Sequence, residues 1–309
     1  MHAVYYKEGK VELREMKDLP DEGKKVHVKS AGICGSDLHL LEMKLPLPYI
    51  AGHEIAGVLD DGTPVAVEPL IPCEECDYCR GGNYNLCQLV ITLGIGRNGG
   101  MADEVIVPER NLVYLPSNVD VKDACLIEPL AVAMHGLRKA CVNGKGRVAI
   151  IGGGAIGLSA VAVAVSSYTE VGLSARYHHQ IEAGSLIGAR EIDGLYDLVI
   201  ECAGTEDAVK QAVQLCRPNG KILMLGTHWG SVSFPQLSAM MKELTVVNSY
   251  TYAADGLGRD FDFAAALLSR NPGIASALIT HRFPLAEVKQ AFMVARDRKS
   301  GAIKVILEP

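Results

Sequence analysis

The sequence predicts an α/β protein of two domains, one mostly β and one built around a doubly wound parallel sheet. The N-terminal third alternates short β-like runs with Gly, Pro and Asp, which is typical of irregular antiparallel structure. From Gly146 onward, apolar strands alternate with helical segments, which indicates βαβ units. A short apolar run near the end is expected to rejoin the first half. We therefore expect a first domain of residues 1–124 completed by 272–309, and a second domain of residues 125–271.

Individual elements follow from the same patterns. In the first domain, β-like runs predict strands at residues 25–30 and 63–67. In the second domain, apolar runs predict strands at residues 148–151, 197–202 and 221–225, with a helix over 158–165. Near the end of the chain, residues 283–298 are expected to be helical and residues 302–307 to form the returning strand.

The composition narrows the range of possible functions. The 309 residues are 49% hydrophobic and 21% charged, which is enough material for two cores. A net charge of −6 argues against nucleic acid and anionic membranes as partners, because both are bound through clustered Lys and Arg. There is no long apolar span and no basic segment followed by an apolar one at the start, so we expect a cytoplasmic protein acting on a small molecule.

The cysteine spacing predicts a metal site. In a reducing compartment the nine cysteines are expected to stay free for metal binding or catalysis. Cys73, Cys76, Cys79 and Cys87 follow the pattern Cys-x2-Cys-x2-Cys-x7-Cys, which lets one loop wrap four thiolates around a zinc ion. Four thiolates leave no open position, so this zinc would be structural. An iron–sulfur cluster is the alternative, although its usual spacings differ.

A glycine-rich turn predicts a dinucleotide site. After the apolar strand at residues 148–151, the motif Gly-x-Gly-x-x-Gly opens a helical run inside the βαβ region. The glycines allow a tight turn and close approach of pyrophosphate to the N–H groups at the helix start. The expected cofactor-binding residues of this turn are Gly152, Gly154, Ala155, Ile156 and Gly157.

The choice between NAD and NADP is expected to lie about twenty residues further on, where an acid would hold the ribose 2′-hydroxyl of NAD. No acid occurs there. Ala175 removes the charge that would repel a 2′-phosphate, and Arg176, together with Ser174, Tyr177 and His179, could bind one. We therefore expect NADP(H) to be preferred over NAD(H). The alternative is that Arg176 is a solvated loop residue and NAD is used.

The whole pattern resembles the zinc-containing medium-chain dehydrogenase/reductase family. The motifs that carry the resemblance are residues 32–39 (Gly-Ile-Cys-Gly-Ser-Asp-Leu-His), residues 52–54 (Gly-His-Glu), the four-cysteine loop and the later glycine turn. Glu128-Pro-Leu resembles the sorbitol, threonine and butanediol dehydrogenase branch, which carries a zinc-site glutamate there. The resemblance implies a GroES-like catalytic domain joined to a Rossmann domain.

The resemblance also implies a second, catalytic zinc. It makes Cys34 and His53 ligands, with Glu54 as a ligand or exchange partner and Glu128 as the remaining candidate. Alcohol dehydrogenase itself uses two cysteines and a histidine, whereas this chain has no cysteine at the family position; Cys125 lies three residues before Glu128. Glu54, Glu128 and water all remain open as the group that completes the sphere. Two zinc ions per chain are therefore expected.

The implied reaction is hydride transfer between NADP(H) and the carbinol or carbonyl carbon of a secondary alcohol, polyol or amino alcohol. Zinc would lower the pKa of the substrate hydroxyl, and the cofactor would accept the hydride. Ser36 and His39 match the family's hydroxyl-to-histidine proton relay. Residues 58–65 form a shorter hairpin than in typical relatives, which changes the expected pocket.

Two other functions compete with this one. The chain could be an NADPH-binding redox sensor or structural member without turnover, but the presence of both Cys34 and His53 disfavours that interpretation. A zinc-free quinone or enone reductase would need neither the Cys34–His53 pair nor the cysteine loop. We also expect a homodimer or homotetramer.

Overall fold

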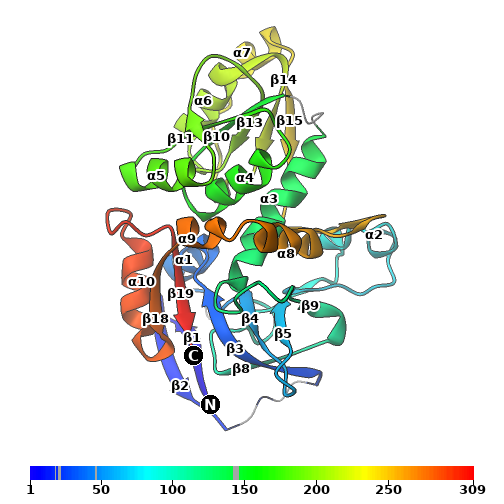
Figure 1. The fold of residues 1–309 in the computed structure, drawn as a ribbon, viewed down its shortest axis with the longest axis vertical. Helices are drawn as coiled ribbons and strands as arrows, with labels where there is room; N and C mark the ends of the chain where they lie inside the picture. The colour runs from blue at the N-terminus through cyan, green and yellow to red at the C-terminus, as the bar shows by residue number, and fades with distance from the viewer. Residues whose placement is uncertain (18, 20–21, 46, 142–145) are drawn as a thin grey trace. The chain divides into compact units, whose positions relative to one another are not determined.

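The structure is a computed structural model that describes residues 1–17, 19, 22–45, 47–141 and 146–309. The chain divides into two compact units, the first Met1–Glu128 with Ala253–Pro309 and the second Pro129–Tyr252 (Figure 1). The return to the first unit therefore comes earlier than the expected residue 272. Its physical cause is Arg259, whose guanidinium binds Glu68 and the backbone of Leu112, and which holds the following helix in the first unit.

The first unit is built on a mainly antiparallel sheet. Its strands pair in the order β18-β19-β3-β4-β5-β9, and β8 pairs with β3; β18 and β19 are parallel. The antiparallel character predicted for the N-terminal third is confirmed. The strands are β3 (Lys24–Gly32), β4 (Glu54–Val58), β5 (Pro64–Val67), β8 (Glu104–Val107), β9 (Leu112–Tyr114), β18 (Ile279–Pro284) and β19 (Lys304–Glu308).

Smaller elements complete the first unit. Three further strand pairs are β1 (His2–Lys7) with β2 (Lys10–Glu15), β6 (Leu70–Ile71) with β7 (Ile91–Thr92), and β16 (Ala254–Asp255) with β17 (Gly258–Arg259). Its helices are α1 (Gly35–Glu42), α2 (Asp77–Arg80), α8 (Asp260–Arg270), α9 (Gly273–Leu278) and α10 (Val288–Arg296). The short helices η1 (Tyr84–Leu86), η2 (Glu109–Asn111), η3 (Ala124–Leu126) and η4 (Leu285–Glu287) lie between them.

The C-terminal helix is shorter than predicted, mainly at its start; it ends at Arg296. A helix was expected over residues 283–298, but Phe283 and Pro284 end strand β18, and the α-helix begins only at Val288. Pro284 has no N–H to donate and disfavours helical backbone in the residue before it, so the helix starts after it. The returning strand is confirmed: β19 pairs with β3, Ile306 opposite Gly32.

The second unit is a doubly wound parallel sheet with strand order β12-β11-β10-β13-β14-β15. Its strands are β10 (Arg147–Ile151), β11 (Glu170–Ser174), β12 (Arg190–Glu191), β13 (Tyr196–Glu201), β14 (Cys216–Met224) and β15 (Thr245–Asn248). Its helices are α4 (Ala155–Val165), α5 (His178–Leu186), α6 (Glu206–Leu215) and α7 (Gln236–Met241), while α3 (Ile127–Ala140) enters from the first unit. The sheet topology is that of a Rossmann domain.

Helices cover the two faces of this sheet. Alternate residues of a strand point to opposite faces, and Ala149 and Ile151 of β10 pack against Ala208 and Ala212 of α6. Helix α4 connects β10 to β11 on the other side of β10, so right-handed crossovers place α4 and α6 on opposite faces. The sheet is therefore buried between two helical layers, which explains its nearly continuous apolar strands.

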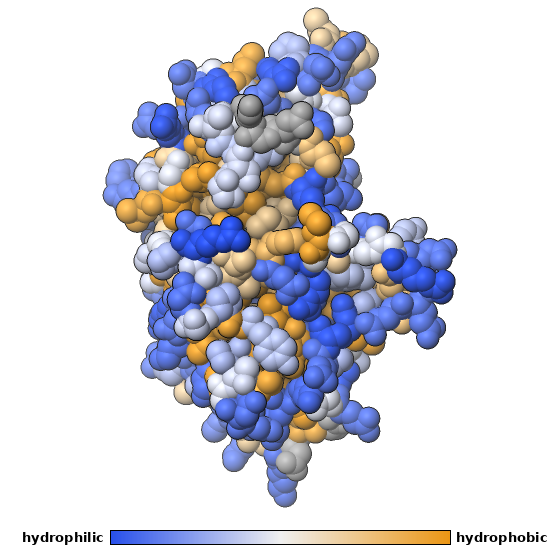
Figure 2. Space-filling view, turned by 45° about the vertical axis from the view of Figure 1, so that its right-hand side comes forward, coloured by the Kyte–Doolittle hydropathy of each residue, from blue (hydrophilic) through white to orange (hydrophobic). Residues whose placement is uncertain are grey.

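The surface is largely polar on the face that Figure 2 shows. On the face drawn in Figure 2 the outermost side chains are mainly hydrophilic, with smaller apolar groups among them. Among the described residues, no helix has both the length and the apolar composition needed to cross a bilayer.

Candidate metal and cofactor sites

The four cysteines of the predicted loop converge on one point. The ligand atoms of Cys73, Cys76, Cys79 and Cys87 all lie within 4.8 Å of one another. The Sγ atoms of Cys73 and Cys79 are 3.8 Å apart, and those of Cys76 and Cys79 are 3.4 Å apart. Four sulfurs bound to zinc at about 2.3 Å would be separated by about 3.8 Å, so the arrangement fits a tetrahedral ion.

Local backbone structure aims these thiols inward. Glu74 adopts a left-handed φ of 63°, which turns the chain sharply between Cys73 and Cys76, and Cys76 then caps α2. The backbone N–H of Cys76 donates to Cys73 Sγ at 3.4 Å. Hydrogen bonds from the N–H groups of Glu75 and Cys76 lower the pKa of Cys73 to about 6. Cys73 thus favours the thiolate, which is the form that binds metal, whereas burial and the neighbouring thiols raise the pKa of Cys79 to about 12.

A second cluster joins two adjacent strands of the first unit. Ligand atoms of Cys34, His53 and Glu54 lie within 4.8 Å of one another. Gly32 of β3 is paired opposite Glu54 of β4, which brings together Cys34, just after β3, and His53, just before β4. A Cβ on Gly32 would lie 1.9 Å from Glu54 Oε2, so only glycine leaves room for the carboxylate.

His53 is oriented by its neighbours. The residue is buried; its Nε2 lies 3.4 Å from Ser36 Oγ, and its Nδ1 lies 3.8 Å from Asp37 Oδ1. Asp37 is itself held by the backbone N–H of Cys34 at 2.8 Å. Burial lowers the pKa of His53, but the nearby Asp37 and Cys34 outweigh this effect, so the net pKa lies well above its usual value. Nε2 is thus the ring nitrogen near Ser36, while Nδ1 is buried beside Asp37 with no hydrogen-bond partner in the described residues.

Glu54 forms a buried ion pair with Lys304. The Nζ atom of Lys304 lies 2.5 Å and 2.6 Å from the two carboxylate oxygens, and it also donates to the Ile33 carbonyl at 3.2 Å. The two side chains are only 2% and 1% exposed. Burial lowers the pKa of Lys304, but Glu54 more than offsets it, and the pKa lies above its usual value. The Glu54 carboxylate is therefore already neutralised by a cation of the chain.

Glu128 occupies the first turn of α3 near the same cluster. It is 7% exposed, and within the described part of the chain it has no hydrogen bond or ion pair. Burial raises the pKa of Glu128, His53 and Lys304 lower it, and Glu54 raises it, so that the net pKa is about 7. A buried carboxyl group of this kind needs a cation to be stable as an anion. Glu128 is thus close enough to His53 to interact electrostatically, although it is not part of the tight three-residue cluster.

Ser36 and His39 both lie on α1 but make different contacts. The Ser36 hydroxyl faces His53 Nε2, whereas His39 Nδ1 lies 3.6 Å from Glu42 Oε2. The His39 side chain is 41% exposed. Ser36 is therefore placed at the metal cluster, and His39 at the solvent side of the same helix.

The glycine turn has the geometry of a dinucleotide-binding loop. Gly152 has a φ of +109°, and a Cβ on Gly157 would lie 1.8 Å from the Gly152 carbonyl oxygen. These two glycines are required by the turn and by the packing of α4 against it. A Cβ on Gly154 would meet nothing within 4 Å, so the backbone there opens onto free space. Ala155 and Ile156 then form the first turn of α4, whose N–H groups point to that space.

The end of β11 lies next to this turn. Ser174 is the last residue of β11, and its carbonyl accepts the Gly152 N–H at 2.8 Å. The Ser174 hydroxyl accepts from Gln211 Nε2 at 2.9 Å, Ala175 follows without charge, and Arg176 is exposed. Tyr177 stacks on His179 with ring centroids 5.6 Å apart, and His179 Nε2 is buried with no partner in the part of the chain that the structure describes.

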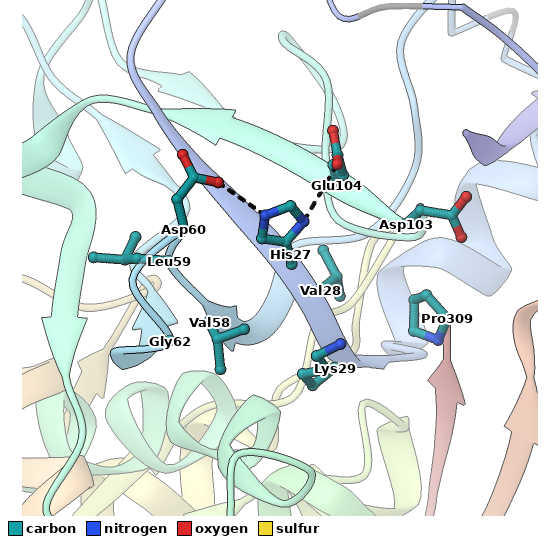
Figure 3. A pocket seen from close by; sticks show the side chains of 10 residues that line it. All are labelled: His27, Val28, Lys29, Val58, Leu59, Asp60, Gly62, Asp103, Glu104 and Pro309. Atoms are coloured by element: carbon teal, nitrogen blue, oxygen red, sulfur yellow. Dashed lines mark hydrogen bonds and ion pairs between the residues drawn. The ribbon is translucent and has the colours of Figure 1, made fainter.

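A separate cavity of about 430 Å³ opens beside β3 and β4 (Figure 3). Three of its polar groups are paired with one another: His27 Nε2 lies 2.9 Å from Asp60 Oδ1, and His27 Nδ1 lies 3.2 Å from Glu104 Oε1. Of the described residues that line it, none is a predicted ligand or cofactor contact. It therefore contributes nothing to the predicted chemistry.

Lys304 is the residue of the metal cluster that the sequence did not predict. It opens the apolar strand β19, where a lysine is unusual, and this was the one available signal. Its partner Glu54 lies 250 positions away in the chain. Only the pairing of β19 with β3 brings them together.

Comparison with protein families supports the motifs found in the chain. Residues 21–117 match the model of the alcohol dehydrogenase GroES-like domain, and residues 188–269 match the model of the zinc-binding dehydrogenase. The first match contains the four-cysteine loop, Cys34 and His53. The glycine turn lies between the two matched segments and is supported by its own geometry.

Relatives and solved structures match nearly the whole chain. A sorbitol dehydrogenase of Halalkalibacterium halodurans is 32% identical over 331 residues, covering 95% of this chain and 94% of the relative. A zinc-binding dehydrogenase of Sinorhizobium meliloti 1021 bound to NADP has a TM-score of 0.88 and 28% identity, covering 100% and 99% of the two chains. An alcohol dehydrogenase of Escherichia coli CFT073 complexed with NADH has a TM-score of 0.89 and 26% identity, covering 100% and 99%.

The alignment with the sorbitol dehydrogenase also bears on the shortened hairpin. It extends over 331 residues, which is more than the 309 residues of this chain, so the relative carries segments that this chain lacks. The β4–β5 connection, residues 59–63, is a place where the sequence predicts such a shortening.

Proposed function

Because the chain belongs to the zinc-containing medium-chain dehydrogenase/reductase family, we propose that it transfers a hydride between NADP(H) and the carbinol or carbonyl carbon of a secondary alcohol, polyol or amino alcohol. The observation that carries this proposal is the buried cluster of Cys34, His53 and Glu54 with Glu128 nearby. A thiol, an imidazole and a carboxylate form the donor set of a catalytic zinc site with an open position. The sorbitol dehydrogenase relative favours a polyol.

We assign Cys34, His53 and Glu128 as the ligands of the catalytic zinc. Glu54 is held on both oxygens by Lys304, so its charge is satisfied without a metal. Glu128 is also buried but forms no ion pair with any residue that the structure describes. Glu54 therefore serves as a second-sphere group, and the fourth position is left for water or the substrate oxygen.

The residues around this position have distinct tasks. When bound, zinc lowers the pKa of a substrate hydroxyl; NADP+, when bound, accepts the hydride. Asp37 lies beside the His53 ring, 3.8 Å from Nδ1, and Ser36 Oγ beside Nε2 would relay the proton that the substrate hydroxyl releases, passing on its own hydroxyl proton as it accepts that one. His39, on the solvent side of α1, would pass that proton to water. In the buried Glu54–Lys304 pair the two opposite charges neutralise each other, so the pair adds no net charge beside the ligands.

A second zinc would be held by Cys73, Cys76, Cys79 and Cys87. These four thiols satisfy the coordination of the ion, so its task is to hold the loop between β6 and β7 together. Two zinc ions per chain are therefore proposed. All nine cysteines are free.

NADP(H) is the proposed cofactor. Gly152, Gly154 and Gly157, with Ala155 and Ile156 at the start of α4, would bind the pyrophosphate. At the end of β11, the uncharged Ala175 leaves space for a 2′-phosphate, and Arg176, Ser174 and Tyr177 would line it. Arg176 has no ion pair to a described carboxylate, so its charge is available for the phosphate. The NADP-bound relative supports this choice, while the NADH-bound relative has the same fold.

The test combines metal analysis with turnover. The purified chain is expected to contain two zinc ions and to reduce NADP+ faster than NAD+ with polyols, secondary alcohols and threonine, measured by absorbance of the reduced nicotinamide. A clear preference for NAD+ would overturn the cofactor assignment. Cofactor binding without turnover of any of these substrates would favour the redox-sensor alternative.

A further inference from the structure

The Rossmann sheet reverses its winding between β10 and β13. From β10 the chain passes through α4 to β11 on one side, and from β13 through α6 to β14 on the other. A dinucleotide binds across the crevice at such a point, outside the carboxyl ends of the strands. The glycine turn and the end of β11 belong to the half that binds the adenosine side. The nicotinamide half of the cofactor therefore faces the residues that follow β13 and β14.

Those residues form two closely joined loops. The N–H groups of Leu225 and Gly226 donate to the Glu201 carbonyl at 2.9 Å and 2.8 Å. A Cβ on Gly226 would lie 2.4 Å from Glu201 Oε2, and a Cβ on Gly204 would lie 2.8 Å from the Thr227 carbonyl oxygen. The loop after β13 and the loop after β14 are thus hydrogen-bonded and closely packed, and together they form one platform.

One polar side chain on this platform is held by a buried carboxylate. Glu201 is fully buried, and its Oε1 accepts the N–H groups of Ala203 and Gly204 at 2.8 Å and 2.7 Å. Its Oε2 lies 3.2 Å from Nε2 of His228, whose side chain is 15% exposed. The dehydrogenase mechanism described above uses neither residue.

The pairing decides which ring nitrogen of His228 carries the proton. A carboxylate can only accept hydrogen bonds, so Nε2 is the donor to Glu201 and Nδ1 of the neutral ring is an acceptor. Within the described residues, Nδ1 has no partner. The carboxamide NH2 group is the only hydrogen-bond donor of a nicotinamide ring.

We propose that His228 Nδ1 accepts a hydrogen bond from the carboxamide NH2 of the nicotinamide ring and so orients the ring for hydride transfer. The proposal rests on the dinucleotide binding proposed above and adds a residue to it. His228 is held in place from behind by Glu201, so little side-chain entropy would be lost on binding. Acceptor and donor match in this tautomer, and the opposite tautomer would place two donors against each other.

The test compares ligands that differ only at the nicotinamide end. Dissociation constants are measured by calorimetry for NADP+, its 3-acetylpyridine analogue, which lacks the NH2 group, and 2′-phospho-ADP-ribose, which lacks the ring. The same three measurements are made in parallel with the ligands that lack the 2′-phosphate, namely NAD+, its 3-acetylpyridine analogue and ADP-ribose. His228→Ala is expected to weaken NADP+ binding about three- to tenfold, the usual range for one hydrogen bond, and to leave 2′-phospho-ADP-ribose unchanged. It should also abolish the preference for NADP+ over the acetylpyridine analogue.

Three further variants sharpen the result. His228→Gln keeps an acceptor oxygen and should retain part of the preference, which also covers the case that His228→Ala does not fold. Glu201→Gln offers an NH2 donor to Nε2, and the preference should fall because Nδ1 then carries the proton. His281→Ala, which removes a histidine from β18 in the first unit, should change none of these constants.

The outcomes separate this inference from the cofactor proposal. Equal weakening of NADP+ and 2′-phospho-ADP-ribose in His228→Ala would show a purely structural role and overturn the inference. Unchanged binding of NADP+ would overturn it as well. If the wild-type chain binds neither dinucleotide series, the cofactor proposal itself fails.

Discussion

At the scale of single residues, the expected cofactor preference depends on the charges of two neighbouring side chains at the end of β11. Ala175 lies at the end of β11, where its Cβ would be 2.7 Å from a Cβ on Gly153 in the glycine turn. Next to it, Arg176 is exposed and has no carboxylate partner in the described residues. A side chain at position 175 is thus close to the expected position of the adenosine ribose. Its charge should determine whether the chain prefers NAD(H), which has a 2′-hydroxyl on that ribose, or NADP(H), which has a 2′-phosphate.

Ala175→Asp is expected to weaken NADP+ binding about 10- to 100-fold, because a carboxylate would repel the 2′-phosphate that Arg176 attracts. Binding of NAD+ should be unchanged or tighter. The measurement is the ratio of the two dissociation constants, with the uncharged Ala175→Asn as the matched control. An equal loss for both cofactors would mean that the substitution disturbs the turn and not the phosphate.

At the scale of elements, Arg259 connects the start of α8 to the segment before the cysteine loop. Its guanidinium lies 3.1 Å from Glu68 Oε2 and donates to the carbonyls of Arg110 and Leu112. The Tyr84 hydroxyl donates to the other oxygen of Glu68, which is fully buried. Burial raises the pKa of Glu68, while Tyr84 and Arg259 lower it; the net shift is upward. Ionised Glu68 therefore depends on these partners.

Arg259→Met should destabilise the first unit by about 3 kcal/mol near pH 8, because it leaves a buried carboxylate without its cation. Glu68 already binds its proton more tightly in the folded chain, so ionisation costs stability as the pH rises through the unfolded pKa of about 4.3. Arg259→Met removes a cation that lowers the pKa of Glu68, so the pKa of Glu68 in the folded variant is higher still. Its loss of stability, measured by urea unfolding, should therefore be smaller near about pH 5.5 than near pH 8.

The control for Arg259→Met is Arg282→Met, which removes an exposed arginine paired with Asp123 and Glu308. It should cost about 1 kcal/mol or less, with little difference between the two pH values. An equal loss for Arg259→Met at both pH values would show that Glu68 is not the group responsible.

The cysteine loop is the second element whose stability can be tested directly. Cys76→Ser should reduce the zinc content from two ions to one per chain and expose the segment between β6 and β7 to proteolysis. The reason is that three thiolates and a hydroxyl bind zinc more weakly than four thiolates. Cys141→Ser, at an exposed cysteine outside both clusters, should leave the zinc content unchanged. A zinc content of two in Cys76→Ser would contradict the assignment.

At the scale of the whole molecule, each unit has its own apolar core, and the Rossmann sheet has an open edge. Strand β15 is the last strand of that sheet. Val246 on β15 is 40% exposed, and Leu237 and Met241 on the neighbouring α7 are 63% and 77% exposed. An edge strand with exposed apolar side chains is a surface that another chain can cover.

We expect β15 and α7 to form a dimer interface with a second copy of the chain. Light scattering after gel filtration should give the mass of a dimer or of a tetramer built from it. Val246→Lys combined with Met241→Lys should yield monomers, since two desolvated charges oppose association. Leu186→Lys, at a 78% exposed leucine on α5, is the matched control and should not change the mass. A monomeric wild-type chain would contradict the expectation.

Local sequence patterns determined the two-domain fold, the cysteine loop and the glycine turn, because each of these depends on residues close together in the chain. Cys73 to Cys87 and Gly152 to Gly157 carry their geometry in their spacing. The pairing of Cys34 with His53 followed from the family resemblance, and the register of β3 with β4 supplies its physical cause. The start of α10 was placed too early, because the effect of Pro284 on the preceding backbone competes with the helical pattern.

Only the tertiary structure decided which charges meet in the interior. Lys304 reaches Glu54 through the pairing of β19 with β3, and Arg259 reaches Glu68 through the return of the chain to the first unit. His228 reaches Glu201 because β13 and β14 are neighbours. A buried charge is stable only beside its partner, and these partners are separated by up to 250 positions. Spacing along the chain therefore identifies the ligands of a local loop, whereas folding selects the partners that balance a buried charge.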